Sequence, residues 1–100
     1  MKLYLVHCGF YENEVMDGVY ESHVNFFVVA ESFEDARARA KRNALFQKKR
    51  MHVDGLQQLD AIDGYRVALE EDRALDGKTQ VLTDRYRGLA AKNPEKPSLH

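Results

Sequence analysis

Alternating apolar and polar positions at the start of the chain predict two β-strands joined by a polar connection. Residues 2–8, KLYLVHC, alternate between two faces in the manner of a strand. The faces are Leu3, Leu5 and His7 on one side, and Tyr4, Val6 and Cys8 on the other. Residues 23–30, HVNFFVVA, are apolar on both faces, which is typical of a strand inside a sheet. Residues 9–22 hold two glycines and four acidic residues and predict a loop or an open hairpin connection.

Residues 32–50, SFEDARARAKRNALFQKKR, predict one helix. Ser32 is a good N-cap because its hydroxyl can accept from an unpaired backbone N–H. Asp35 lies three residues on, where a capping box has Glu or Gln. The apolar positions at helical spacing form one narrow face, and its three alanines let the helix lie close to a sheet. That face is Phe33, Ala36, Ala40 and Ala44.

Strand-like spacing resumes after the helix and predicts a β-hairpin of residues 53–62 and 65–70. Asp63-Gly64 favours a two-residue turn, which would place Ile62 opposite Tyr65 and Asp60 opposite Val67. Further on, residues 80–83 fit a short edge strand and residues 84–92 a last helical turn or two. The tail, residues 93–100, is polar with two prolines, and we expect it to be disordered.

The predicted order of elements, β-β-α-β-β, gives a two-layer α+β domain with a mixed sheet and one main helix on one face. A right-handed crossover through the helix would make strands two and three parallel, with strands one and four antiparallel to their neighbours. We assign residues 1–92 to this single domain. One helix covers only one sheet face, so either the C-terminal segment or a second subunit must cover the other. We expect a homodimer.

Composition narrows the class of protein. The chain has 100 residues, 44% of them apolar, which fits one domain with a modest core. Its net charge of −1 does not indicate a general nucleic-acid or membrane binder. Cys8 is the single cysteine, so no internal disulfide is possible. The chain has no long apolar run or export signal, and we expect a soluble cytoplasmic protein without membrane contact.

Two stretches carry a resemblance to a known family. GVYESHVNFFVVAESFEDARARAKR followed by HVDGLQQLDAIDGYRVAL resembles the small bacterial family catalogued as domain of unknown function 1543. The resemblance covers roughly residues 1–71. Its most specific parts are the step from Glu21 to His23 into FFVVAE, the helix after it, and His52-Val53-Asp54 with Asp63-Gly64-Tyr65 downstream. It implies the fold boundaries and a bacterial origin. It implies no catalytic residue, cofactor or partner.

His52 and Asp54 form the first candidate for chemistry. A histidine with a carboxylate two residues away can be an oriented general base or a pair of metal ligands, because residues i and i+2 of a strand share a face. The alternative is structural: His52 ends the helix, where free carbonyls favour a polar or cationic residue, and Asp54 starts a turn. We expect the structural role for His52, with its ring bonded to backbone.

The remaining candidates for a polar site are His7, Cys8, Glu21 and His23. Pairing of the first two strands would bring His7 near His23. Zinc needs about three or four ligands of these types, but their spacing matches no known ligand pattern. Cys8 lies on the strand face opposite His7, and such a residue is more often a small buried apolar one than a nucleophile. We therefore expect no metal and no cofactor, and leave catalytic residues unassigned.

A run of basic residues in the predicted helix is the most distinctive electrostatic feature. It comprises Arg37, Arg39, Lys41, Arg42, Lys48, Lys49 and Arg50. A basic surface for phosphate or nucleic acid is one interpretation. The others are matching of the helix dipole, with Glu34 and Asp35 at the start, and pairing with the acidic half of the chain. Without a glycine-rich phosphate loop, we expect no nucleic-acid binding.

Together these patterns predict a non-enzymatic cytosolic module that binds an unknown protein or small ligand as a homodimer. One alternative is a small metal-binding domain or enzyme that uses His23, His52 and Asp54. Another is an RNA-binding module that uses the basic helix, residues 37–50.

Overall fold

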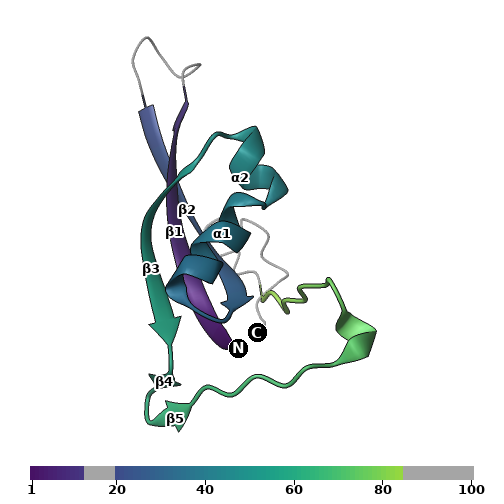
Figure 1. Ribbon diagram of the computed structural model, residues 1–100. Helices are drawn as coiled ribbons and strands as arrows, with labels where there is room; N and C mark the ends of the chain where they lie inside the picture. The colour runs from purple at the N-terminus through teal and green to yellow at the C-terminus, as the bar shows by residue number, and fades with distance from the viewer. Residues whose placement is uncertain (13–19, 85–100) are drawn as a thin grey trace, which may run out of the picture.

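The fold is built on one antiparallel sheet of three strands, seen in a computed structural model that describes residues 1–12 and 20–84 (Figure 1). The strands are β1 (Lys2–Glu12), β2 (Tyr20–Ala30) and β3 (His52–Leu59). Strand β1 lies in the centre and pairs antiparallel with both neighbours, in the order β2-β1-β3. The first two strands reach further than expected, so the loop predicted for residues 9–22 is wrong at both ends. Its middle, residues 13–19, lies outside the described residues.

The α+β class and the order of the first four elements are confirmed, but the mixed sheet is wrong. Strands β2 and β3 run in the same direction, as predicted, because each is antiparallel to β1. They do not pair, however, since β1 lies between them. The central place suits β1 because its row of Tyr4, Val6, Cys8 and Phe10 is the most deeply buried of the fold.

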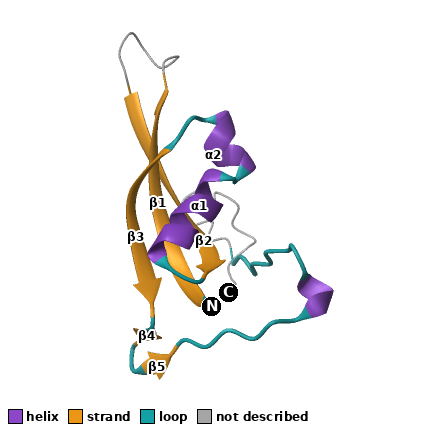
Figure 2. Cartoon of the chain, viewed as in Figure 1, coloured by secondary structure: helices purple, strands orange, loops and turns teal. Residues whose placement is uncertain are grey.

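The predicted single helix is two helices, α1 (Phe33–Lys41) and α2 (Ala44–Lys48), packed on one face of the sheet (Figure 2). Ser32 caps α1 as predicted: its Oγ accepts from the backbone N–H of Asp35 at 3.0 Å. The break follows from Asn43, whose Oδ1 accepts from the N–H groups of Leu45 and Phe46. Asn side chains favour such caps over helix interiors, so the chain starts a new helix there.

The core lies between the helices and the sheet face that carries Tyr4, Val6 and Cys8. Ala36 and Ala40 are fully buried, which confirms the close approach of the helix. Ala44 was expected to continue this apolar face but is exposed, because the helix breaks before it. Phe46 of α2 and Met51 just before β3 close that end of the core instead.

The predicted hairpin exists but is short and stands apart from the main sheet. Strands β4 (Ala61–Ile62) and β5 (Tyr65–Arg66) form a two-stranded sheet, with Ile62 opposite Tyr65. Asp63 and Gly64 both have positive φ, as the turn requires. The N–H of Val67 donates to the carbonyl of Asp60, which confirms the predicted register. Beyond it the backbone is irregular, so strand four never joins the main sheet.

The C-terminal part of the chain holds one described element, the 3₁₀ turn η1 (Arg73–Leu75). The edge strand predicted for residues 80–83 is wrong, since that segment has no strand pairing and Leu82 is 99% exposed. The helical turn at residues 84–92 and the tail at residues 93–100 lie outside the described residues from residue 85 onward. None of the helices in the described ranges is long and apolar enough to cross a membrane.

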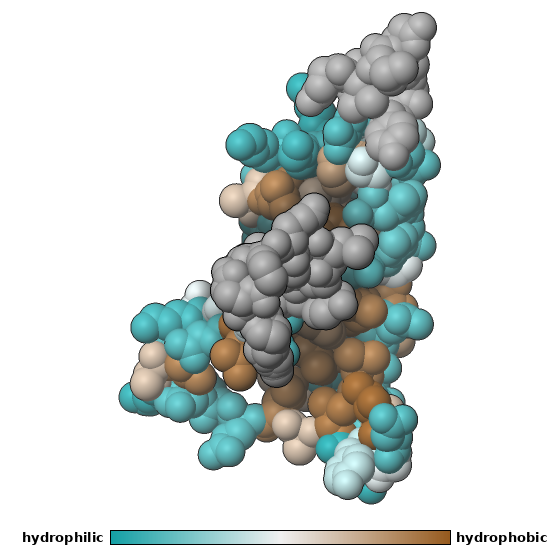
Figure 3. Space-filling view, turned by 180° about the vertical axis from the view of Figure 1, so that it is seen from behind, coloured by the Kyte–Doolittle hydropathy of each residue, from teal (hydrophilic) through white to brown (hydrophobic). Residues whose placement is uncertain are grey.

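The sheet face away from the helices, here called the open face, changes from polar to apolar along its length. The paired rows across β2, β1 and β3 are His23–Gly9–His52, Asn25–His7–Gly55, Phe27–Leu5–Gln57 and Val29–Leu3–Leu59. At the apolar end, Phe27 is 59% and Val29 41% exposed. Figure 3, seen from behind Figure 1, shows hydrophobic surface gathered in the lower part of the molecule.

Candidate functional site

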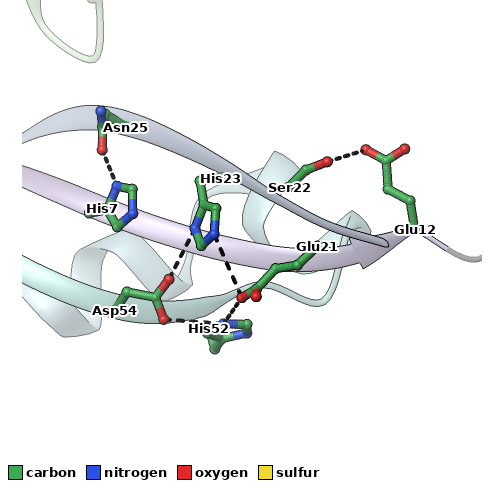
Figure 4. Close-up of polar contacts among 8 residues, drawn as sticks. All are labelled: His7, Glu12, Glu21, Ser22, His23, Asn25, His52 and Asp54. Carbon is green, nitrogen blue, oxygen red and sulfur yellow. Dashed lines mark hydrogen bonds and ion pairs between the residues drawn. The ribbon is translucent and has the colours of Figure 1, made fainter. Parts of the chain in front are cut away.

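Four ionisable side chains converge at the polar end of the open face (Figure 4). Glu21 and His23 come from β2, and His52 and Asp54 come from β3, so the group bridges the two outer strands across β1. We call these four residues the His–carboxylate cluster. Their side chains are between 31% and 44% exposed, which leaves the cluster open to solvent.

Each imidazole of the cluster contacts both carboxylates. His23 Nδ1 lies 3.3 Å from Asp54 Oδ2, and its Nε2 lies 3.8 Å from Glu21 Oε2. His52 Nε2 lies 3.1 Å from Asp54 Oδ1 and 3.5 Å from Glu21 Oε2. The two oxygens of Asp54 therefore point to different rings, and Glu21 Oε2 lies between the same two rings. Such convergence of nitrogen and oxygen donors is what a metal site requires.

A β-bulge in β3 sets the position of Asp54. Cys8 pairs with Val53 but His7 pairs with Gly55, so Asp54 is an extra residue without a partner on β1. Alternation within β3 places Asp54 on the open face beside His52, and the bulge lets Gly55, Gln57 and Leu59 continue on that same face. Bulges often redirect a side chain next to a functional site, and this one adds a carboxylate to a row that would otherwise hold only two imidazoles.

Gly9 of β1 is the floor of the cluster. A Cβ atom at this position would lie 2.8 Å from both Asp54 Oδ2 and His52 Nε2, and 3.1 Å from Glu21 Oε2. Glycine weakens a strand interior, and it often marks a place where another group approaches the backbone closely. Here the missing side chain makes the room in which the imidazoles and carboxylates meet.

His7 extends the cluster toward the middle of the open face. Its ring stacks on that of His23, with centroids 5.0 Å apart and planes at 9°. Its Nδ1 donates to Asn25 Oδ1 at 2.6 Å, since an amide oxygen only accepts. Two groups each bring three possible ligand atoms within 4.8 Å of one another: Glu21, His52 and Asp54, and His7, His23 and Asp54.

The local positions that the structural interpretation assumed for His52 and Asp54 are wrong. His52 is the first residue of β3 and Asp54 lies inside that strand, so His52 does not end a helix and Asp54 does not start a turn. The ring of His52 contacts carboxylates on two strands and lies 5.8 Å from the ring of Tyr11, centroid to centroid. The helix ends earlier than predicted, near Lys48, and Arg50 with positive φ turns the chain into β3.

Cys8 takes no part in the cluster. Its side chain is fully buried on the helix side of β1, opposite His7, as the alternation predicts. Burial raises the pKa of the Cys8 thiol above its ordinary value, and the negative charge of Asp54 raises it further. A thiol held protonated in this way is a poor nucleophile and metal ligand, so Cys8 serves as a small core residue.

The basic residues lie on the other side of the molecule, on α1, α2 and the turn after them. All six candidates for a basic surface are exposed: Arg37, Lys41, Arg42, Lys48, Lys49 and Arg50. Arg39 instead pairs with Asp35, whose carboxylate also accepts from the N–H of Glu31. The Glu31 N–H first, and the Arg39 guanidinium after it, hold the pKa of Asp35 below its ordinary value. Part of the run thus pairs locally.

Sequence reasoning named all four residues of the cluster but missed Gly9 and the bulge. The one signal for Gly9 is a glycine directly after a clear strand pattern, and such a glycine equally predicts the start of a loop. The bulge left no signal, because a one-residue excess in strand pairing appears only when both strands are aligned.

Comparison with known proteins identifies the family without an activity. No curated protein and no solved structure matches the chain. Residues 18–69, more than half of the chain, match the family described as Domain of Unknown Function (DUF1543). This range contains β2, α1, α2, β3 and the hairpin, and with them the whole His–carboxylate cluster. The resemblance seen in the sequence is thereby confirmed over residues 18–69, and the chain belongs to this family of unknown function.

Proposed function

We propose that this domain binds a divalent transition-metal ion of the zinc class at the His–carboxylate cluster. The observation that carries the proposal is the convergence of two imidazoles and two carboxylates over Gly9. Lys and Arg offer no competing partner, since neither Glu21 nor Asp54 forms an ion pair with one in the described part of the chain. The sequence patterns favour a non-enzymatic binding module over a metal-binding domain. The convergence of the four cluster side chains favours the metal-binding domain instead.

The chemistry of the donor set fits this class of metal. Imidazole suits zinc, copper, iron and nickel, and carboxylate oxygens complete many zinc sites. Glu21 and Asp54 supply two negative charges, which match the charge of a divalent ion. The exposure of the cluster leaves room on its solvent side for a small ligand. Binding is the activity proposed, and no reaction is assigned to the site.

Metal analysis tests this proposal. Protein purified without chelator, supplied with zinc and passed through gel filtration is expected to retain about one zinc per chain. His52→Ala and Asp54→Asn are expected to lose it, because each removes a ligand shared by the cluster.

Asp60→Asn is the matched control for the carboxylate change. Asp60 is an exposed aspartate that accepts from Gln58 and lies outside the cluster. It is expected to retain zinc like the wild type. The proposal would be contradicted if the wild type retained less than about one zinc ion per ten chains. Equal zinc retention by Asp54→Asn and Asp60→Asn would also contradict it.

We also infer that the domain associates as a homodimer through the apolar end of the open face, defined by Leu3, Phe27, Val29 and Leu59. Fully burying a Phe or Val side chain gains roughly 1.5–3 kcal/mol, so this exposure is costly in a free chain. Among the described residues of the C-terminal part, Val81 and Leu82 are themselves strongly exposed and do not cover this surface. Residues 85–100 contribute few large apolar side chains, namely Tyr86, Leu89 and Leu99. A second copy offers an apolar surface of matching size.

Sedimentation equilibrium at micromolar concentration checks the dimer. The wild type is expected to have twice the chain mass of 11.5 kDa. Phe27→Asp is expected to be a monomer, because it places a charge in the contact, whereas Leu82→Asp, a matched change at a fully exposed position, is expected to stay dimeric. A wild-type mass of one chain would contradict the dimer and indicate that the chain covers its own open face.

A further inference from the structure

A cavity lies directly beside the His–carboxylate cluster on the open face. Its volume is about 390 Å³, and its lining comes from all three strands: Leu5, His7, Asn25, Gly55, Leu56 and Gln57. Gly55 opens the middle of it, because a Cβ atom built there would meet nothing within 4 Å. The cavity shares no residue with the apolar end proposed as the dimer contact.

His7 connects the cavity to the cluster. Its ring lines the cavity and stacks on His23, while its hydrogen bond to Asn25 fixes the orientation of both side chains. Moving along the face from the cluster, a ligand would meet an imidazole, then two amide side chains, then the aliphatic wall of Leu5. Ligand sites are typically of this kind, mostly apolar with a few polar groups, and a volume of this size lies at the small end of their range.

We propose that this cavity holds the body of a small organic anion whose charged head binds the metal ion in the cluster. The ligand class is a short aliphatic carboxylate or hydroxamate. The inference rests on the metal site proposed above and names what that site binds.

The charges at the cluster explain why the head must bind through metal. Glu21 and Asp54 point toward the place where the head would lie, and without a cation their carboxylates repel an anion. A bound divalent ion reverses the sign of the local field and offers its solvent-side position to the ligand's oxygens. The aliphatic part then extends over Gly55 toward Leu5, with Asn25 and Gln57 on either side.

A chain-length series on the zinc-loaded full chain tests the inference. Calorimetric titration with hydroxamates from acetohydroxamate to hexanohydroxamate is expected to show a Kd that falls about fourfold with each added methylene. The metal-free chain is expected to bind none of them. Metal analysis of each sample is recorded in parallel.

Gly55→Val is designed to fill the cavity without touching a metal ligand. It is expected to retain about one zinc per chain and to bind acetohydroxamate. It is not expected to bind longer hydroxamates more tightly than shorter ones. Leu5→Asn, which replaces the aliphatic wall with an amide, is expected to reduce the increase in affinity with chain length and provides a second variant should Gly55→Val not fold.

The outcomes separate the two proposals. Two outcomes would contradict the cavity proposal while leaving the metal site intact. One is normal zinc binding with a hydroxamate Kd that does not depend on the length of the hydroxamate. The other is an increase in hydroxamate affinity with chain length that persists in both variants. Failure of the wild type to take up zinc would overturn both.

Discussion

Zinc is expected to raise the free energy of unfolding of this domain by about 2.7 kcal/mol when free zinc is 100 times its Kd. For a domain of this size that gain corresponds to a rise in Tm of about 10–20 °C. The reason is that the cluster joins β2 to β3 across β1, so its ligand set is assembled only when the sheet is folded. Thermal unfolding followed by circular dichroism, with and without zinc, measures the shift.

Variants distinguish this effect from non-specific binding of zinc. His52→Ala and Asp54→Asn are expected to lose the rise in Tm, while Asp60→Asn keeps it in full. An equal rise in all of these proteins would place the ion elsewhere on the surface. A fall in Tm on zinc addition would mean that unfolded chains bind the metal better than folded ones, against the proposal.

Gly9→Ala is expected to weaken zinc binding strongly while leaving the fold nearly intact. The added methyl group would lie 2.8 Å from atoms of His52 and Asp54 and must displace them. Those atoms are the ends of side chains that can rotate outward, so the sheet itself need not move. Disturbing the support of metal ligands typically costs 10–100-fold in affinity, and we expect at least about 100-fold here because several ligands move together.

Gly55→Ala makes the matched change in the same sheet. It adds the same methyl group to a neighbouring row of the open face, where the space is free. Its zinc affinity, measured by competition with a chromogenic chelator, is expected to equal that of the wild type. Equal affinities for Gly9→Ala and Gly55→Ala would mean that the cluster does not bind the metal over Gly9.

The parts of the fold that follow from local pattern were predictable from the sequence. Alternation alone placed His7 on the open face and Cys8 in the core, and the sheet obeys it because neighbouring side chains of a strand must point to opposite faces. The Ser32 cap and the Asp63-Gly64 turn were equally local, since each depends on the chemistry of one or two residues.

The features that depend on pairing between strands were not predictable. The place of β1 in the centre of the sheet, and the bulge at Asp54, follow from alignments between segments far apart in sequence. Asn43 ends the first helix because its side chain caps a new helix instead of allowing the first one to continue. The helical spacing of apolar residues over 33–44 gives no sign of this break. The sequence therefore identified the residues of the candidate site but not its geometry. The role of Gly9 depends on the side chains of β2 and β3 that lie next to it in the sheet.

The central claim is that the His–carboxylate cluster holds a zinc ion over Gly9. A crystal grown with zinc and measured above and below the zinc absorption edge tests it most directly. We predict one anomalous peak per chain above Gly9, at about 2.0–2.2 Å from ligand atoms of His52, Asp54 and Glu21. A map in which the imidazoles and carboxylates of the cluster contact only one another, with zinc absent or bound elsewhere, would contradict the claim.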